Sequence, residues 1–130
     1  MKNIKTNLLI ATFVLLILAL PACKKNSDGG DAEVHAKITN NGTPINNAHV
    51  YIKFGTTTQP SDPTTNYDLM AHGESTDNHV HIEGLRPGDY YLYATGTNTA
   101  TGKAVKGGTS VSIAWKERKD MIDADVEVSE

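Results

Sequence analysis

Short stretches in which apolar and polar residues alternate follow one another from Ala32 to the end of the chain. Alternation with a period of two is typical of a strand that buries one face, and no segment here repeats its apolar residues at helical spacing. This pattern restricts the chain to a fold built from strands, with a further strand expected within residues 67–75. The rows predicted to be buried are Val34, Ala36 and Ile38; Ala48, Val50, Ile52 and Phe54; Val80 and Ile82; Tyr90, Leu92 and Ala94; Val111, Ile113 and Trp115; and Ile122, Ala124, Val126 and Val128.

Clusters of Gly, Pro, Asn and Asp separate these rows and predict turns. They lie at residues 40–42, at the corner 84–89, at residues 97–102 and at the pair Gly107-Gly108. Residues 55–66 form a longer loop rich in Thr and Pro, and residues 116–120 a charged turn or a single helical turn. About seven short strands joined in this way predict an all-β fold, an Ig-like antiparallel β-sandwich over residues 32–130.

The N-terminal segment has the features of a secretory signal peptide. Lys2 and Lys5 precede an apolar run at residues 8–20 that only Thr12 interrupts. These 13 residues are too few for a membrane-spanning helix, which needs about 20. We therefore predict a cleaved signal peptide at residues 1–22, with an uncleaved anchor helix as the alternative.

The end of that segment, Leu20-Pro21-Ala22-Cys23, resembles the lipobox of bacterial lipoproteins, and Cys23 is the only cysteine of the chain. The resemblance implies cleavage before Cys23, a diacylglycerol on its sulfur and acylation of its new amino group, for example by palmitate. Two or more such chains hold a protein firmly to a membrane. The lipobox resemblance thus implies an exported protein anchored in the outer membrane of the cell envelope. Either the periplasmic or the surface side of that membrane is compatible with it. A plain cleaved signal peptide with an incidental cysteine is the alternative.

Residues 23–31 are polar and contain two glycines after the cysteine, which predicts a flexible lipidated tether. Residues 24–31 also resemble the export tags of surface lipoproteins of the Bacteroidetes type. Removing 22 of the 130 residues leaves 108, enough for one small domain, and changes the net charge from −3 to −5. This acidity disfavours a nucleic-acid partner. The expected partners are the membrane, through the lipid, and a protein or glycan ligand.

Three segments, residues 42–45, 48–52 and 76–92, resemble the carboxypeptidase regulatory-like, or prealbumin-like, superfamily, which includes collagen-adhesin B-type repeats. The most specific part is the Gly-Leu-x-Pro-Gly-x-Tyr motif at residues 84–90. Asn78 stands where the family usually has glycine, and we expect it to adopt the left-handed conformation of that turn. The resemblance implies a prealbumin-like sandwich that acts as a binding, spacer or structural module.

Histidines are the first candidates for chemistry. His79 and His81 lie two apart, so both should point to the polar face of their strand and are weak candidates for a metal. His35 and His49 also fall on polar faces. Because the sequence places only two ligands together, we expect no metal site tighter than about micromolar, and no cofactor is assigned.

The acidic row Asp123, Asp125 and Glu127 could attract calcium, but a solvated edge is the preferred interpretation.

Tyr91 and Tyr93 alternate with the buried residues of their row, which predicts that both point outward and form a ligand face with the loop 55–66. Tyr51 should lie on an outward face as well. The alternative is that these tyrosines pack only against cross-strand neighbours. Trp115 is expected in the core or at its rim.

Catalytic motifs are absent from the sequence, and no catalytic residue is assigned. Prealbumin-like folds include hydrolases of a purine-breakdown intermediate, but the His, Arg and C-terminal patterns of those enzymes are missing here. The expected function is therefore a non-enzymatic, lipid-anchored binding or structural module. A histidine-based metal-binding envelope protein is the alternative, and a hydrolase of unrecognised type is the third.

Overall fold

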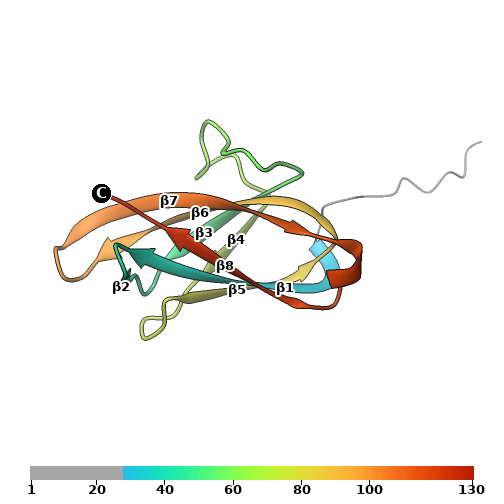
Figure 1. Cartoon of the computed structure of the whole chain (residues 1–130). Helices are drawn as coiled ribbons and strands as arrows, with labels where there is room; N and C mark the ends of the chain where they lie inside the picture. The colour runs from blue at the N-terminus through green and yellow to red at the C-terminus, as the bar shows by residue number, and fades with distance from the viewer. Residues whose placement is uncertain (1–27) are drawn as a thin grey trace, which may run out of the picture.

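Two β-sheets packed face to face make up the domain in the computed structural model, which describes residues 28–130 (Figure 1). The prediction of an all-β sandwich is confirmed, with eight strands in place of about seven. Within the described residues the only helical segment is one short 3-10 turn, η1. The elements are β1 (Asp28–Asn40), β2 (Thr43–Pro44), β3 (His49–Phe54), β4 (Leu69–His72), β5 (His79–Leu85), β6 (Gly88–Asn98), β7 (Lys103–Ile113), η1 (Trp115–Glu117) and β8 (Met121–Glu127).

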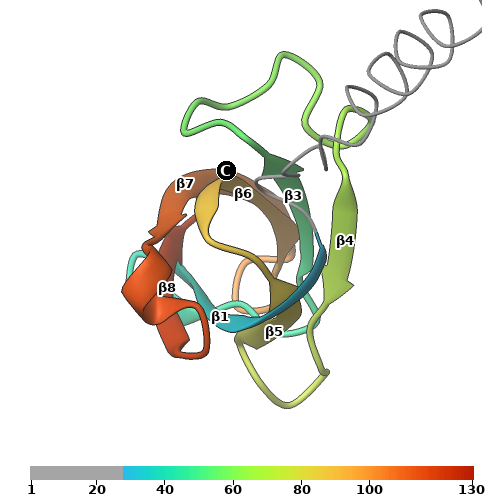
Figure 2. The ribbon, with the colours of Figure 1, turned by 90° about the vertical axis from the view of Figure 1, so that its right-hand side faces the viewer.

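The first sheet, here the β1 sheet, is built around β1. This strand pairs with β5 in antiparallel fashion along one edge and with β8 in parallel fashion along the other, while β2 folds back on its end. The second sheet, the β3 sheet, has the order β4-β3-β6-β7, and all of its pairs are antiparallel. The parallel β1–β8 pair departs from the predicted antiparallel sandwich. The two sheets meet where Lys106 and Ser129 exchange backbone hydrogen bonds, which closes one side of the sandwich (Figure 2).

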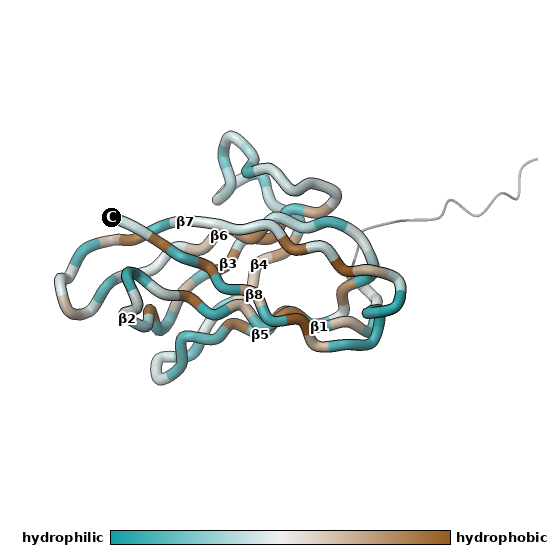
Figure 3. The backbone as a smooth tube through the Cα atoms, in the orientation of Figure 1, coloured by the Kyte–Doolittle hydropathy of each residue, from teal (hydrophilic) through white to brown (hydrophobic). Residues whose placement is uncertain are grey.

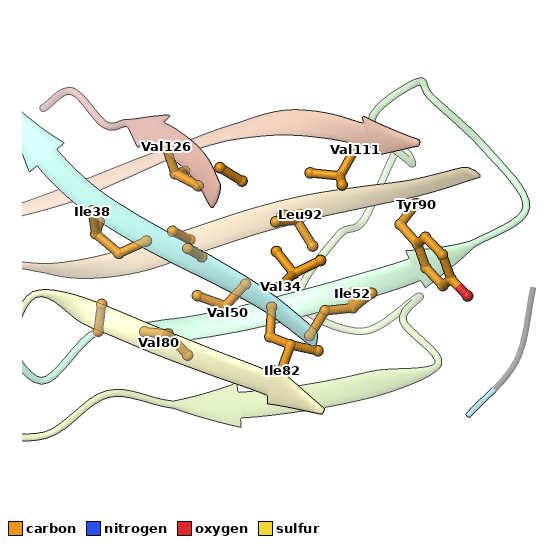
Figure 4. Close-up of a cluster of buried hydrophobic side chains, with 14 of the residues drawn as sticks. Val34, Ile38, Val50, Ile52, Val80, Ile82, Tyr90, Leu92, Val111 and Val126 are labelled. Atoms are coloured by element: carbon orange, nitrogen blue, oxygen red, sulfur yellow. The ribbon is translucent and has the colours of Figure 1, made fainter. Parts of the chain in front are cut away.

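The core lies between the sheets and contains most of the residues in the predicted rows, together with Ala32, Ile45, Leu85 and Val105. Val50, Ile52, Leu92 and Val126 are each 0% exposed, and the labelled side chains converge from both sheets (Figure 4). Along the strands, apolar positions alternate with polar ones (Figure 3). The row 111–115 is interrupted: β7 ends at Ile113, and Trp115 enters η1 and is 72% exposed. The expectation that Trp115 belongs to the core or its rim is wrong, because the period of two ends with the strand.

The predicted corner at residues 84–89 is the bend between β5 and β6. Leu85 and Tyr90 are fully buried on either side of it, and Gly84 and Gly88 have φ angles of 75° and 150°. The Tyr90 hydroxyl donates a hydrogen bond to the Arg86 carbonyl oxygen at 2.6 Å. A tyrosine that bonds back to the backbone just upstream holds such a corner in Ig-type sandwiches.

Two glycine pairs predicted to be flexible or in turns lie inside strands. Asp28 to Asp31 begin β1, so the strand starts within the predicted tether. A Cβ on Gly30 would lie 2.1 Å from the Leu85 carbonyl oxygen, so only glycine permits this approach of β1 to β5. Gly107 and Gly108 lie within β7, and a Cβ on Gly107 would lie 2.3 Å from the Glu127 carbonyl oxygen. Gly30 and Gly107 therefore allow two backbone segments to approach each other closely.

Asn78 does not adopt the left-handed conformation expected of it. The non-glycine residues with positive φ in the described part of the chain are Asn41 and Asn47. Instead, the Asn78 side-chain amide donates to the Ile38 carbonyl oxygen at 2.9 Å, and its own carbonyl accepts from the Ile38 amide. Asn78 therefore ties the start of β5 to β1.

Candidate functional site

The outer face of the β3 sheet carries an aromatic patch, here the tyrosine face, formed by Tyr51, Tyr67, Met70, Tyr91 and Tyr93. Strand register brings these side chains together: Tyr51 on β3 lies opposite Met70 on β4 and opposite Tyr93 on β6. The rings of Tyr51 and Tyr67 are 5.1 Å apart between centroids. Tyr67 and Met70 are 38% and 47% exposed, respectively. The patch is therefore contiguous and open to solvent at the β4 side.

The loop between β3 and β4 reaches the other side of this patch. The Tyr91 hydroxyl donates to the Gln59 side-chain oxygen at 3.2 Å, and the loop stands outside the sheet in both ribbon views (Figures 1 and 2). The Tyr91 ring lies over Gly108. A Cβ added to Gly108 would lie only 2.7 Å from Tyr91 Cε1, so glycine makes room for the ring. Partial burial and the neighbouring Tyr93 raise the pKa of Tyr91 above its ordinary value. Tyr91 thus joins the sheet to the loop predicted to flank the ligand face.

Tyr93 is placed on the predicted face but is not exposed. It lies on the central strand β6, between Tyr51 on β3 and Gly108 on β7, and is only 8% exposed. The period of two correctly gives its direction, whereas its burial depends on neighbours from two other strands. Of the two predicted ligand residues, Tyr91 keeps accessible surface and Tyr93 supports the face from beneath.

A second group, the Glu33 triad, lies on the outer face of the β1 sheet and consists of Glu33, His35 and His81. Glu33 and His35 are two residues apart on β1, and His81 on β5 is the register partner of His35. His35 Nε2 and His81 Nδ1 lie 2.9 and 2.8 Å from the same carboxylate oxygen, Glu33 Oε1. The two imidazole rings are 4.0 Å apart between centroids, in an edge-on arrangement. One donor atom from each residue lies within 4.8 Å of the others.

Electrostatics hold the triad's carboxylate in its ionised form. The hydrogen bond from His81, assisted by the one from His35, lowers the pKa of Glu33 below its ordinary value despite a partial loss of solvation. His35 Nδ1 also faces Asp123 Oδ1 on the parallel neighbour β8, at 3.9 Å. The side chains of His35, Glu33 and His81 are 19%, 25% and 51% exposed, so the triad is open on the His81 side.

His79 and His81 share the outer face of β5, as predicted, but their side chains have different partners. His79 Nδ1 lies 2.8 Å from Asp77 Oδ1, while His81 turns to Glu33. Sequence reasoning missed Glu33 entirely and did not join His35 to His81, because the pairing of β1 with β5 is not visible in either strand. The available signal was that Glu33 and His35 alternate with buried Val34 and so share one polar face.

The remaining candidates are not assembled into sites. His49 and His72 are cross-strand partners on the β3 sheet with rings 4.3 Å apart, but the Glu33 triad is the only group of three potential metal ligands found among residues 28–130. In the acidic row, Asp123 and Asp125 are exposed. Glu127 accepts hydrogen bonds from the Thr39 hydroxyl and the Asn41 amide. Its role is to tie β8 to the end of β1.

No family model, curated protein or solved structure matches this chain. The signal segment, the lipobox and Cys23 lie outside the described residues. No helix within residues 28–130 is long and apolar enough to cross a membrane.

Proposed function

We propose that this chain is a non-enzymatic, lipid-anchored module of the cell envelope that binds a glycan through the tyrosine face. The anchor is the lipid on Cys23 expected from the lipobox. The observation that carries the binding role is the contiguity of Tyr51, Tyr67, Met70 and Tyr91 on one sheet face, bordered by a polar loop bonded to Tyr91.

The chemistry of this face favours a glycan over a protein partner. Tyrosine rings offer flat apolar area with a polar hydroxyl, which suits the apolar faces of sugar rings. The loop contributes Thr, Gln, Asn and Asp side chains that can donate to and accept from sugar hydroxyls. A protein interface would be expected to have a larger apolar centre, and here Tyr67 and Met70 are the large apolar side chains exposed on this face.

The length of the tether favours a ligand within the envelope. β1 begins at Asp28, five residues after Cys23. Five extended residues span at most about 18 Å. The β5–β6 corner lies next to both the loop and the start of β1. Tyr90, just after the corner, pairs with Phe54, the last residue before the loop. Leu85, within the corner, pairs with the start of β1. The loop that borders the tyrosine face is therefore at the tethered end of the domain.

The anchor is tested by replacing Cys23 with serine. The wild-type protein should sediment with membranes and carry acyl mass on Cys23, whereas Cys23→Ser should lose the acyl mass and leave the membrane fraction. Intact-mass spectrometry of the purified protein provides the measurement. An unacylated wild-type protein that begins downstream of Cys23 would refute the anchor.

Glycan binding is tested with an immobilised panel of peptidoglycan, lipopolysaccharide-derived and neutral polysaccharides, using the full chain in mild detergent. We expect the double variant Tyr67→Ala/Tyr91→Ala to weaken the captured interaction at least tenfold, about 1.4 kcal/mol. Trp115→Ala is the matched control, because it removes an exposed aromatic ring outside this face. The tyrosine face is rejected as the glycan site if the double variant binds as well as the wild type does, or if Trp115→Ala loses as much binding as the double variant.

A further inference from the structure

We infer that Glu33, His35 and His81 form a three-ligand site for a divalent transition-metal ion such as Zn²⁺ on the outer face of the β1 sheet. This site is on the opposite face of the sandwich from the tyrosine face and does not depend on the function proposed above. It also differs from the pair His79 and His81 considered from the sequence, because the third ligand and one histidine come from β1.

The distances between the donor atoms match the needs of a tetrahedral ion. Zn²⁺ binds imidazole nitrogen and carboxylate oxygen at about 2.0–2.2 Å, so neighbouring ligand atoms are about 3.3 Å apart. Glu33 Oε1 is 2.9 Å from His35 Nε2 and 2.8 Å from His81 Nδ1, and all three donors lie within 4.8 Å of one another. An ion at the centre of the three donors requires Glu33 Oε1 to move away from the two imidazoles and the side chains to adjust around it, within a group that already spans no more than 4.8 Å.

The backbone beneath the triad is already fixed. Glu33 and His35 flank Val34, which is 0% exposed, and His81 lies between Val80 and Ile82, each 1% exposed. These buried neighbours hold both strands in register, so ion binding requires only side-chain adjustment. Ligand residues on rigid strands hold their positions before the ion binds, so binding does not have to order the backbone.

The hydrogen-bond pattern allows the protons to be relocated on binding. Without metal, one ring nitrogen of each histidine donates to Glu33. When the ion binds, it occupies the ring nitrogen that had carried the proton. Each ring stays neutral because its proton moves to the other ring nitrogen. For His35 that nitrogen is Nδ1, which faces Asp123 Oδ1 at 3.9 Å. A carboxylate that accepts this N–H orients the ring and strengthens its donation to the ion. The exposed Asp123 side chain has to move closer than 3.9 Å to accept it, so we assign Asp123 a minor positioning role.

The ligand set selects the kind of ion. Two imidazoles and one carboxylate suit Zn²⁺ and Cu²⁺, whereas Ca²⁺ and Mg²⁺ prefer oxygen ligands only. Three protein ligands leave a fourth tetrahedral position for water or an external ligand. His81, with its side chain 51% exposed, borders the route by which the ion enters.

The chain offers close controls for this assignment. His79 lies on the same strand and face as His81 but is bonded to Asp77. The pair His49 and His72 repeats the cross-strand contact of His35 and His81, with rings 4.3 Å apart, but lies outside the only three-ligand group of the described residues. If two adjacent histidines were sufficient, this pair would bind as well as the triad.

The test is a Zn²⁺ titration of the full, metal-free chain in mild detergent, in competition with a chromogenic chelator. We expect one Zn²⁺ per chain with a Kd below about 10 µM, and tighter binding of Cu²⁺. His81→Ala and Glu33→Gln should each weaken binding by more than about tenfold, and Asp123→Asn by a smaller factor. His79→Ala and the double variant His49→Ala/His72→Ala should bind as the wild type does.

Two further measurements keep the result unambiguous. Thermal melts establish that each variant is folded. His81→Ala is chosen over His35→Ala because the His81 side chain is more exposed, 51% against 19%, so its removal should disturb folding less. Co²⁺ in place of Zn²⁺ should give the visible absorption of a tetrahedral ion in the wild type and not in Glu33→Gln. The assignment is overturned if no one-to-one complex forms, or if His81→Ala and Glu33→Gln bind Zn²⁺ as tightly as the wild type does.

Discussion

Glu127 shows how a single exposed side chain can hold two chain segments together. Its carboxylate accepts a hydrogen bond from the Thr39 hydroxyl at 2.7 Å and another from the Asn41 backbone amide. The bond from Thr39, followed by the one from Asn41, lowers the pKa of Glu127 below its ordinary value of 4.5. The ionised form is therefore favoured by the folded state more than by the unfolded chain.

This shift predicts a loss of stability in acid. A carboxyl group with a depressed folded-state pKa stabilises the protein above its unfolded pKa, and the effect is lost as the pH falls through the folded pKa. The melting temperature should therefore fall as the pH decreases below 4.5, the ordinary pKa. Glu127→Gln should be less stable at neutral pH and should show a shallower decline, which thermal melts across the pH series would measure.

Part of the acid sensitivity should remain in that variant, because hydrogen bonds from His81 and His79 also lower the pKa values of Glu33 and Asp77. A variant with the same slope as the wild type would mean that Glu127 makes no pH-dependent contribution.

At the scale of elements, two buried asparagines connect the sheets. Asn98 on β6 donates from its side-chain nitrogen to the Asn40 side-chain oxygen on β1 at 2.9 Å, and Asn40 donates to the Val128 carbonyl oxygen at 2.7 Å. The Asn98 side-chain oxygen also accepts from the Ala100 amide. Asn40 and Asn98 are 7% and 5% exposed, and no buried side-chain polar atom of the described residues lacks a partner. The pair fixes how β1, β6 and the C-terminal segment meet.

Breaking this link should be costly. Asn40→Ala leaves the Asn98 amide and the Val128 carbonyl without their partner, and a buried polar group left unpaired costs about 1–3 kcal/mol. The free energy of unfolding, measured in urea, should fall by that amount. Asn46→Ala is the control, since its exposed bond to the Ser75 carbonyl is 3.3 Å long and its loss should cost about 0.5 kcal/mol or less. Equal effects of the two substitutions would contradict a special role for Asn40.

At the scale of the whole molecule, the last strand completes the fold. β8 covers the free edge of β1 along residues 33–39 and contributes Ala124 and Val126 to the core, followed by Val128. The backbone exchange between Lys106 and Ser129 then attaches this segment to β7. The first and last strands of the described chain therefore lie side by side (Figure 1).

A chain that ends at Arg118 should consequently fail to fold. It would expose the edge of β1 and uncover one side of the core, and an unpaired edge of this kind also promotes aggregation. Near-ultraviolet circular dichroism and the cooperativity of the thermal transition provide the measurement. Removing residues 57–64 from the loop is the control, because none of them belongs to the core and a hairpin-length connection remains. A cooperative transition in the truncated chain would contradict this dependence.

Local patterns account for what sequence reasoning predicted correctly. The buried rows, the corner at residues 84–89 and the outward direction of Tyr91 follow from the period of two and from turn chemistry, which act between residues close in the chain. The same rules failed where a strand ended, as at Trp115, or where glycines served a close approach of two backbone segments, as at Gly30 and Gly107.

Long-range pairing accounts for the rest. Glu33 and His81 are 48 residues apart in the sequence, and Thr39 and Glu127 are 88 apart. No local pattern indicates which strand edges join, because every edge offers the same backbone donors and acceptors. The choice is made by the collective burial of all the apolar rows at once. The parallel β1–β8 pair, the burial of Tyr93 and the assembly of the Glu33 triad therefore became visible only when the strands were placed beside one another.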